Sequence, residues 1–169
     1  MTDSELLRLV SDRQQITDVI YCYCRAMDRI DAEQGYSIWH DDAVVDYGAD
    51  VYQGSGRGFI DHFNAVHSHL LHHTHQVTNI IIELDGDRAA SEAYVTGTLR
   101  MKRDDKLMQI TAWSRYVDQW SRREGRWAID KRVAVMDFDE IREVTSMNKL
   151  SQASRDRTDP SYRVLGGGA

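Results

Sequence analysis

The second half of the chain contains four long stretches rich in β-branched and aromatic residues, and a short polar turn follows each of the first three. The stretches cover residues 74–84, 89–101, 107–120 and 126–138. The turns between them are Asp85-Gly86-Asp87, Arg103-Asp104-Asp105 and Arg123-Glu124-Gly125. Asp-Gly and Glu-Gly between such stretches are typical of β-hairpins, so the pattern predicts an antiparallel meander in one sheet.

The first half has the periodicity of helices instead. Apolar residues recur every three or four positions, which predicts an amphipathic helix over residues 12–30 with Ser4 or Ser11 as its N-cap. We also expect helices over 32–39 and 58–71 and short strands over 43–48 and 50–54. Helices followed by a meander indicate the α+β class. The predicted fold is a cone-shaped, curved antiparallel sheet of four long strands plus short ones, whose pocket the N-terminal helices enclose.

The length of 169 residues corresponds to one domain, which we place at residues 1–145. From residue 146 the chain is polar and ends in a glycine run, so residues 146–169 are expected to form a partly mobile tail. Within this tail, the side chains of Tyr162, Val164 and Leu165 are apolar enough to dock part of it on the domain.

Charge and apolar content argue against two classes of partner. A net charge of -6 and a pI near 5.6 argue against nucleic-acid binding. No apolar stretch approaches the length that spans a membrane, and the N-terminus does not have the pattern of a signal peptide. Cys22 and Cys24 are too close in sequence for a useful disulfide, and two free thiols favour a reducing, cytoplasmic location.

Asp28 and His75 are the strongest candidates for chemistry. Asp28 lies near the end of the predicted helix, where the helix dipole disfavours a carboxylate, and at the edge of the apolar stripe. A histidinium would compensate this charge, and His75 opens the first long strand. A carboxylate and an imidazole in one pocket can move a proton. Two alternatives stay open: Asp28 could cap the helix or face water, and Asp31 could take its place.

Four short segments carry a resemblance to a known family. They are Tyr23-Cys24-Arg25-Ala26-Met27-Asp28, Ile38-Trp39-His40-Asp41-Asp42-Ala43, Thr74-His75-Gln76-Val77-Thr78-Asn79 and Gly125-Arg126-Trp127-Ala128-Ile129. In order and spacing the chain resembles the SnoaL-like, scytalone dehydratase-like branch of the nuclear-transport-factor-2-like superfamily, over roughly residues 5–140. The resemblance implies the fold of that superfamily and a catalytic pair at Asp28 and His75. His75 would be the general base, and Asp28 would orient it and stabilise its charge.

The resemblance also implies three substrate-binding residues. Tyr23 and Tyr47 match tyrosines that bind the substrate carbonyl or the leaving group through water in the family's dehydratases, although Tyr23 could instead complete the apolar stripe. Arg132 matches an arginine that assists a departing halide in the family's dehydrochlorinases. The chain departs from the family's bile acid dehydratases, whose arginine falls where Met136 stands, so the leaving group stays open.

Six histidines fall between residues 62 and 75. On a helix, His69, His72 and His73 would share one face and could hold zinc, but no acidic or cysteine ligand has a matching spacing. We therefore predict no metal and no other cofactor. Of these histidines, His75 alone is expected to point into the pocket.

Together these residues predict a cofactor-independent, dehydratase-like lyase that removes a proton and a leaving group from a mid-sized hydrophobic or aromatic ring substrate. A ketosteroid-type isomerase and a non-catalytic binding module share the fold and stay as alternatives. Arg115, with Trp113 nearby, is a further candidate to face the pocket. The expected lining comprises Trp39, Phe59, Phe63, Met101, Trp113 and Met136. The resemblance also implies a homo-oligomer, a trimer or a dimer, assembled through the outer face of the sheet.

Overall fold

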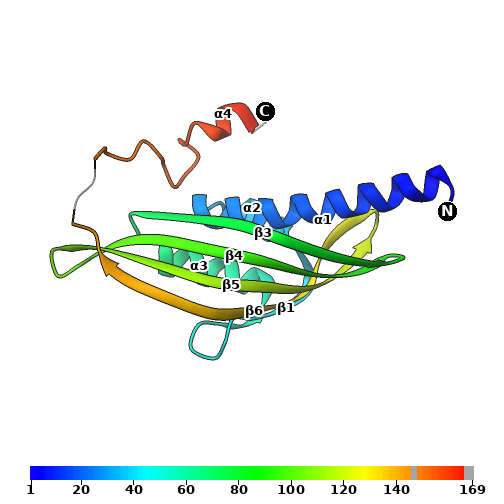
Figure 1. Ribbon diagram of the computed structural model, residues 1–169, viewed down its shortest axis with the longest axis horizontal. Coiled ribbons are helices and arrows are strands. Elements are labelled where there is room, and N and C mark those ends of the chain that lie inside the picture. Colours follow the sequence, from blue (N-terminus) through cyan, green and yellow to red (C-terminus); the bar gives the residue numbers. More distant parts are fainter. Residues whose placement is uncertain (146–147, 166–169) are drawn as a thin grey trace.

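The computed structural model describes residues 1–145 and 148–165, in which a long helix lies over a curved six-stranded sheet (Figure 1). In chain order the elements are α1 (Asp3–Arg29), α2 (Ala32–Ser37), β1 (Trp39–Asp46), β2 (Gln53–Ser55), α3 (Gly56–His67), β3 (His72–Asp85), β4 (Arg88–Arg103), β5 (Lys106–Arg123), β6 (Arg126–Glu143) and α4 (Ser161–Leu165). The α+β class predicted from the sequence is confirmed.

The sheet is the predicted meander, extended at one edge by two short strands. The strands β3, β4, β5 and β6 pair antiparallel in chain order, and two residues form each of the three turns. Glu124 and Gly125 both have positive φ, which matches the twist of a hairpin. β2 pairs antiparallel with β1, but β1 runs parallel to β6. This one parallel pairing departs from the antiparallel sheet expected from the sequence.

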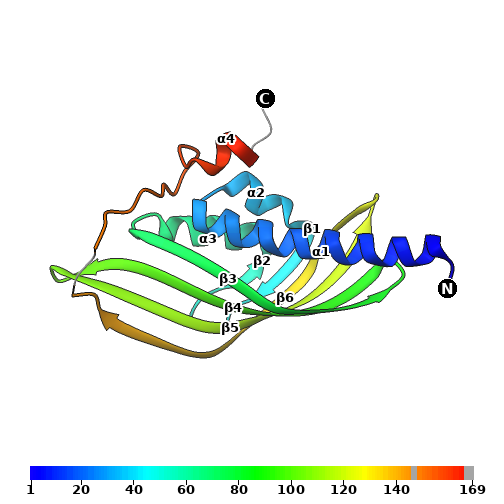
Figure 2. The same ribbon diagram turned by 45° about the horizontal axis from the view of Figure 1, so that its top comes forward.

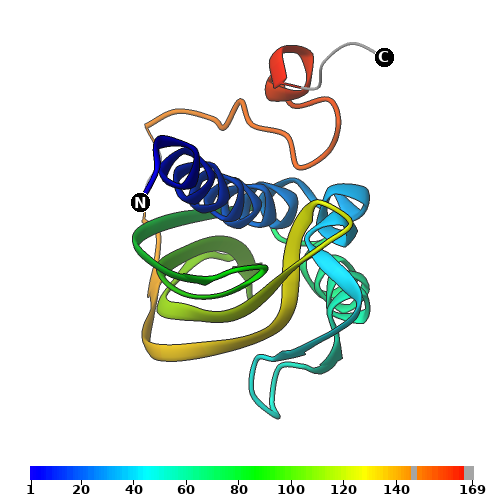
Figure 3. The same cartoon turned by 90° about the vertical axis from the view of Figure 1, so that its right-hand side faces the viewer.

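The helices cover the concave side of this sheet. The strands curl beneath α1, which lies above them (Figure 2). Seen from one end, the sheet wraps below α1, and α3 lies beside the sheet (Figure 3). α1 packs on β3 and β6, and α3 packs on β1. Ile16, Ile20 and Met27 of α1 are fully buried, as the apolar stripe predicts. The sheet and helices thus form the cone that the sequence indicates.

α1 is longer than its apolar stripe. It begins after Thr2, which forms a capping box: the Glu5 N–H donates to the Thr2 hydroxyl, and the Thr2 N–H donates to the Glu5 carboxylate. The predicted N-caps Ser4 and Ser11 are therefore wrong, because both lie inside the helix. Asp28 lies in the last turn of α1, next to β3.

α3 is shorter than predicted, and this changes where the histidines lie. The helix ends at His67 rather than at residue 71, and residues 72–75 belong to β3. Their main chain pairs with β4, so that His75 lies opposite Gly97. The histidines of this segment consequently alternate between the two faces of a strand instead of sharing one face of a helix.

The C-terminal residues 148–165 return to the helical layer. Asp31, the alternative to Asp28, caps α2 and accepts a hydrogen bond from the Tyr162 hydroxyl at 2.6 Å. Val164 and Leu165 are exposed, so of the three docking candidates Tyr162 makes the contact. Residues 146–147 and 166–169 of the predicted tail lie outside the described residues. No helix within the described ranges has the length and apolar character needed to cross a membrane.

Candidate active site

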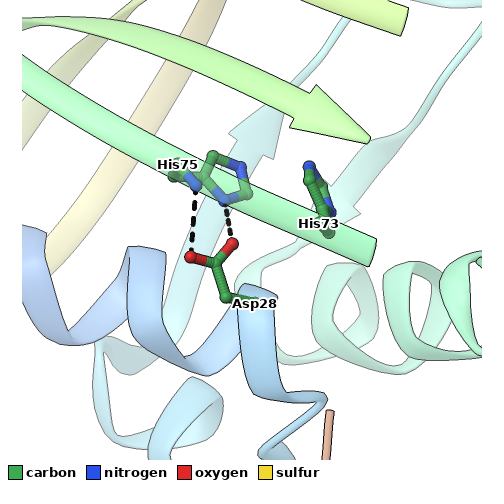
Figure 4. Close-up of side chains that lie close together, drawn as sticks. All are labelled: Asp28, His73 and His75. Carbon is green, nitrogen blue, oxygen red and sulfur yellow. Dashed lines mark hydrogen bonds and ion pairs between the residues drawn. The ribbon is translucent and has the colours of Figure 1, made fainter. Parts of the chain in front are cut away.

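Asp28 and His75 face each other where α1 meets β3 (Figure 4). The ring Nδ1 of His75 lies 2.7 Å from Oδ1 of Asp28, and the His75 backbone N–H donates to Oδ2 at 3.1 Å. Both carboxylate oxygens therefore bond to one residue, which fixes the Asp28 rotamer and the plane of the imidazole. The side chains of Asp28 and His75 are only 13% and 7% exposed. The structure thus brings this candidate pair into direct contact.

The bond to Asp28 also determines which nitrogen of His75 is free. A carboxylate only accepts hydrogen bonds, so the proton of the neutral imidazole lies on Nδ1 and the lone pair on Nε2. Nε2 lies over Gly97 of β4, 3.9 Å from the position that a Cβ would occupy there. A glycine in a strand leaves room for a ligand close to the backbone. His75 is therefore arranged to accept a proton from a molecule bound against β4.

A cavity of about 240 Å³ lies in front of His75, between α3 and the concave face of the sheet. Its wall is mainly apolar and includes Val51, Phe59, Phe63, Leu99, Ile110 and Met136. Trp39 and Met101, which were expected in this wall, are not part of it, and Trp39 is instead buried in the hydrophobic core. A cavity of this size and character suits a compact apolar ring held by a few polar groups.

Tyr23 and Tyr47 supply linked phenols to the cavity wall. Their hydroxyl oxygens lie 2.6 Å apart, and the Tyr47 ring stacks on Phe59 with a centroid distance of 3.9 Å. Burial raises the pKa of Tyr47, and burial and then the neighbouring Tyr116 raise the pKa of Tyr23 well above its ordinary value. Both phenols are therefore neutral at physiological pH, and the pair can donate a hydrogen bond to an oxygen in the cavity.

Arg132 lies behind this pair of tyrosines. Its Nε and Nη2 are each 2.7 Å from a carboxylate oxygen of Asp118, and both side chains are fully buried. The guanidinium lies against the rings of Tyr23 and Tyr116, 4.3 and 4.0 Å from their centroids. Contrary to the prediction from the sequence, Arg132 is therefore not placed to contact a substrate directly, because tyrosine rings separate its guanidinium from the cavity.

Trp113 and Arg115 lie on the outer face of the sheet. Along β5, Ser114 and Tyr116 line the cavity, so the residues between and beside them point away from it. On the outer face, Arg115 forms ion pairs with two acidic side chains, and Trp113 stacks on Phe138 at a centroid distance of 4.8 Å. The prediction that these two residues face the pocket is wrong, because the alternation of the strand assigns them to the other side.

His62, His67 and His73 also line the cavity, so the prediction that His75 alone of these histidines points into it is wrong. His73 precedes His75 by two residues on β3, so both point to the same face, with ring centroids 4.4 Å apart. Burial lowers the pKa of His73 to about 2 and that of His67 to about 4, so both imidazoles are neutral. The two-residue spacing is a sequence signal for His73, but the predicted helix up to residue 71 and the predicted strand from residue 74 both leave His73 out of the strand.

Among the described residues, Asp28, His73 and His75 form the one group that could hold a metal ion. Their potential ligand atoms all lie within 4.8 Å of one another. Oδ1 of Asp28 and Nδ1 of His75 already bond to each other, so an ion held by these two atoms would have to replace the proton between them. The zinc set considered from the sequence does not form, because β3 turns His72 to the opposite face from His73, and His69 is exposed. The arrangement therefore favours proton transfer.

Solved structures share this fold at low sequence identity. A hexachlorocyclohexane dehydrochlorinase (LinA, Type2) superposes with a TM-score of 0.73 at 21% identity, over 88% of this chain and 98% of that chain. A protein assigned as a scytalone dehydratase from Novosphingobium aromaticivorans gives 0.70 at 18% identity, over 91% and 100%. A protein assigned as an aromatic ring hydroxylase from the same organism gives 0.68 at 26% identity, over 80% and 94%.

A family model gives the more specific similarity. No curated protein sequence shows significant similarity to the chain. The model of the SnoaL-like domain nevertheless matches residues 8–133, which is most of the chain and includes both Asp28 and His75. The resemblance expected from the four sequence segments is confirmed. The chain belongs to the SnoaL-like family.

Proposed function

We propose that the protein is a cofactor-independent, dehydratase-like lyase that acts on a mid-sized apolar ring, with His75 as general base and Asp28 as its partner. The observation that carries this proposal is the two-point contact between Asp28 and His75, which leaves Nε2 of His75 facing an apolar cavity. The shared fold with a dehydrochlorinase and with a protein assigned as a scytalone dehydratase supports the same reaction class.

In the proposed reaction, Nε2 of His75 takes a proton from a carbon beside a carbonyl group, and Asp28 stabilises the imidazolium that forms. The electron pair of the broken C–H bond moves toward the carbonyl oxygen. It then returns to expel a substituent from the next carbon, and that substituent takes up the proton. The neutral phenols of Tyr23 and Tyr47 donate a hydrogen bond to the oxygen or to the leaving group, in a site where few other dipoles compete.

An isomerase of the ketosteroid type is the second candidate, and the position of Arg132 favours it. Among the described residues, the cavity wall contains phenols and imidazoles but no lysine or arginine that could hold a departing anion. In an isomerase no group leaves, and His75 returns the proton to a different carbon of the same substrate. The proton abstraction by His75 is common to both candidates.

Two ring ketones separate the candidates. A β-hydroxycyclohexanone loses water to give a conjugated enone, and the β,γ-unsaturated cyclohexenone gives the same enone by isomerisation, so ultraviolet absorbance follows both. Release of chloride from hexachlorocyclohexane tests dehydrochlorination. We expect the protein to accelerate at least one of these reactions, and His75→Gln or Asp28→Asn to lower kcat roughly a hundred- to ten-thousand-fold.

The matched control is His69→Gln, because His69 is exposed and lies outside the cavity wall. This variant should keep the wild-type rate. Full activity in both His75→Gln and Asp28→Asn would contradict the proposal. Binding of these rings without turnover of any of them would instead identify a non-catalytic binding module.

A further inference from the structure

The two ring nitrogens of His73 have different surroundings. The residue is 8% exposed, and its ring stacks on Phe63 with a centroid distance of 5.6 Å. Nδ1 is buried and has no hydrogen-bond partner among the described residues. Nε2 points toward Gly97 on the cavity wall, 3.8 Å from the position that a Cβ would occupy there. One nitrogen is thus enclosed by protein, and the other faces the cavity.

These surroundings indicate which nitrogen of His73 carries the proton. The ring is neutral, because burial and then the neighbouring His75 lower its pKa to about 2. A proton on Nδ1 would leave a buried N–H without an acceptor, which native structures rarely tolerate. A proton on Nε2 gives an N–H that a bound molecule can satisfy. The structure therefore favours a neutral His73 that presents Nε2–H to the cavity.

His73 and His75 converge on the same point of the cavity. The Cβ position above Gly97 lies 3.8 Å from Nε2 of His73 and 3.9 Å from Nε2 of His75. The first nitrogen offers a hydrogen-bond donor, and the second offers a lone pair. A donor and a base side by side match a carbon acid, in which the acidic C–H and the oxygen that stabilises the carbanion are on adjacent atoms.

We propose that His73 is a further catalytic residue, whose Nε2–H binds the carbonyl oxygen of a ring ketone while His75 removes a proton from the adjacent carbon. This inference rests on the proposed function and narrows its substrate class. The C–H electron pair moves to the carbonyl oxygen, which His73 holds as an enolate, and the phenols of Tyr23 and Tyr47 are then left for the leaving group. A ring without an acceptor oxygen would leave the His73 N–H unpaired.

A matched pair of variants tests whether Nε2–H of His73 donates a hydrogen bond to the ketone. Gln places an amide N–H close to where Nε2 of His73 lies, whereas Met has similar length and no donor. The probes are α-tetralone and tetralin, which differ by one carbonyl oxygen, and binding is titrated by NMR. The wild type should prefer α-tetralone, His73→Met should lose that preference by roughly tenfold, and His73→Gln should keep most of it. The affinity for tetralin should not change in either variant.

Two results would overturn the inference: equal binding of the two probes by the wild type, or an unchanged preference for α-tetralone in His73→Met. Circular dichroism verifies that both variants are folded, and His69→Gln should bind as the wild type does. Exchange of the α-protons of α-tetralone with deuterium oxide is measured in the same samples. A wild type that prefers α-tetralone but catalyses no exchange would contradict the proposed function while leaving ketone recognition by His73 intact.

Discussion

Both carboxylate oxygens of Asp28 accept hydrogen bonds from His75, one from the ring and one from the backbone N–H. An asparagine at this position would have to turn its NH₂ group toward one of these two donors, because an amide has only one acceptor oxygen. Either the backbone contact or the Nδ1 proton is then lost. Asp28→Asn should therefore disturb the tautomer of His75 more than it disturbs the fold.

The buried pair of Arg132 and Asp118 gives a prediction about stability. Neither side chain is exposed, so Arg132→Met would leave the Asp118 carboxylate buried without its ion-pair partner. We expect a loss of about 3–5 kcal/mol in the free energy of unfolding, measured with urea. The double variant Arg132→Met, Asp118→Leu should recover most of this loss, because it removes both charges. A single variant within about 1 kcal/mol of the wild type would contradict this interpretation.

The pKa of His73 predicts how stability depends on pH. The folded state keeps His73 neutral down to a pH of about 2, whereas the unfolded chain takes up a proton below about 6.5. The unfolded state thus binds more protons in acid, and stability falls as the pH drops below 6.5, by up to about 1.4 kcal/mol per pH unit. His67 adds the same trend down to a pH of about 4.

Urea unfolding of the wild type and of His73→Met at neutral and mildly acidic pH checks this dependence. The groups that face His73 are Phe63 and His67 of α3, His75 of β3, the carboxylate of Asp28 on α1 within 4.8 Å, and Arg155, whose charge also lowers the pKa of His73. His73→Met should lose less stability than the wild type on acidification. An equal loss in both proteins would contradict the buried neutral state of His73.

At the scale of elements, the segment 148–165 connects the helices and the strand that carry the site residues. Arg155 donates from Nε to the backbone oxygen of Asp28 at 3.2 Å, and from Nη1 to those of His67 and Leu70 at 2.7 and 3.2 Å. These oxygens belong to the end of α1, the end of α3 and the connection to β3. One side chain therefore joins the element of Asp28 to the elements of the cavity histidines.

Arg155→Met should destabilise the fold by about 1–3 kcal/mol, because charge-assisted hydrogen bonds to backbone oxygens are lost. It should also lower kcat more than it raises KM, since the end of α1 positions Asp28. Arg157→Met is the control, because Arg157 is 66% exposed and its ion pairs, with Glu33 and with Asp31 at 3.6 Å, join it to residues outside the cavity wall. Equal effects of the two substitutions on kcat would count against a positioning role for Arg155.

The sequence predicts the hairpins but not their bulges. The turn residues and the stretches rich in β-branched and aromatic residues were enough to locate β3 to β6. A regular β5–β6 hairpin would place Asp118 opposite Lys131, whereas an extra residue at Asp130 shifts the register and brings Arg132 opposite Asp118. The buried ion pair depends on this bulge, so the pattern of the strands alone could not predict it.

The site was predictable to a similar degree. Asp28 stood out because a carboxylate at a helix end, beside an apolar stripe, needs a partner. His73 did not, because the boundary between α3 and β3 depends on pairing with β4 rather than on local preference. Side chains alternate along β5, so Trp113 and Arg115 point outward because Tyr116 points inward. The sequence alone does not show which of the two sets of alternating β5 residues faces the cavity.

At the scale of the whole molecule, the cone divides into a packed end and a hollow end. Trp39, Trp120 and Trp127 fill the packed end, together with the fully buried stripe of α1. α3 and the far halves of β3 to β6 instead leave the cavity that the histidines face. The packed end provides the stability that allows the hollow end to keep its cavity. The homo-oligomer implied by the family resemblance stays a prediction.

Proton abstraction by His75 is tested most directly by exchange at the carbon next to the carbonyl of α-tetralone, followed by proton NMR in deuterium oxide. We predict that the wild type and His69→Gln accelerate exchange, that Asp28→Asn slows it roughly a hundredfold or more, and that His75→Gln returns it to the rate in buffer. Exchange by His75→Gln at the wild-type rate would contradict the assignment of His75 as the base.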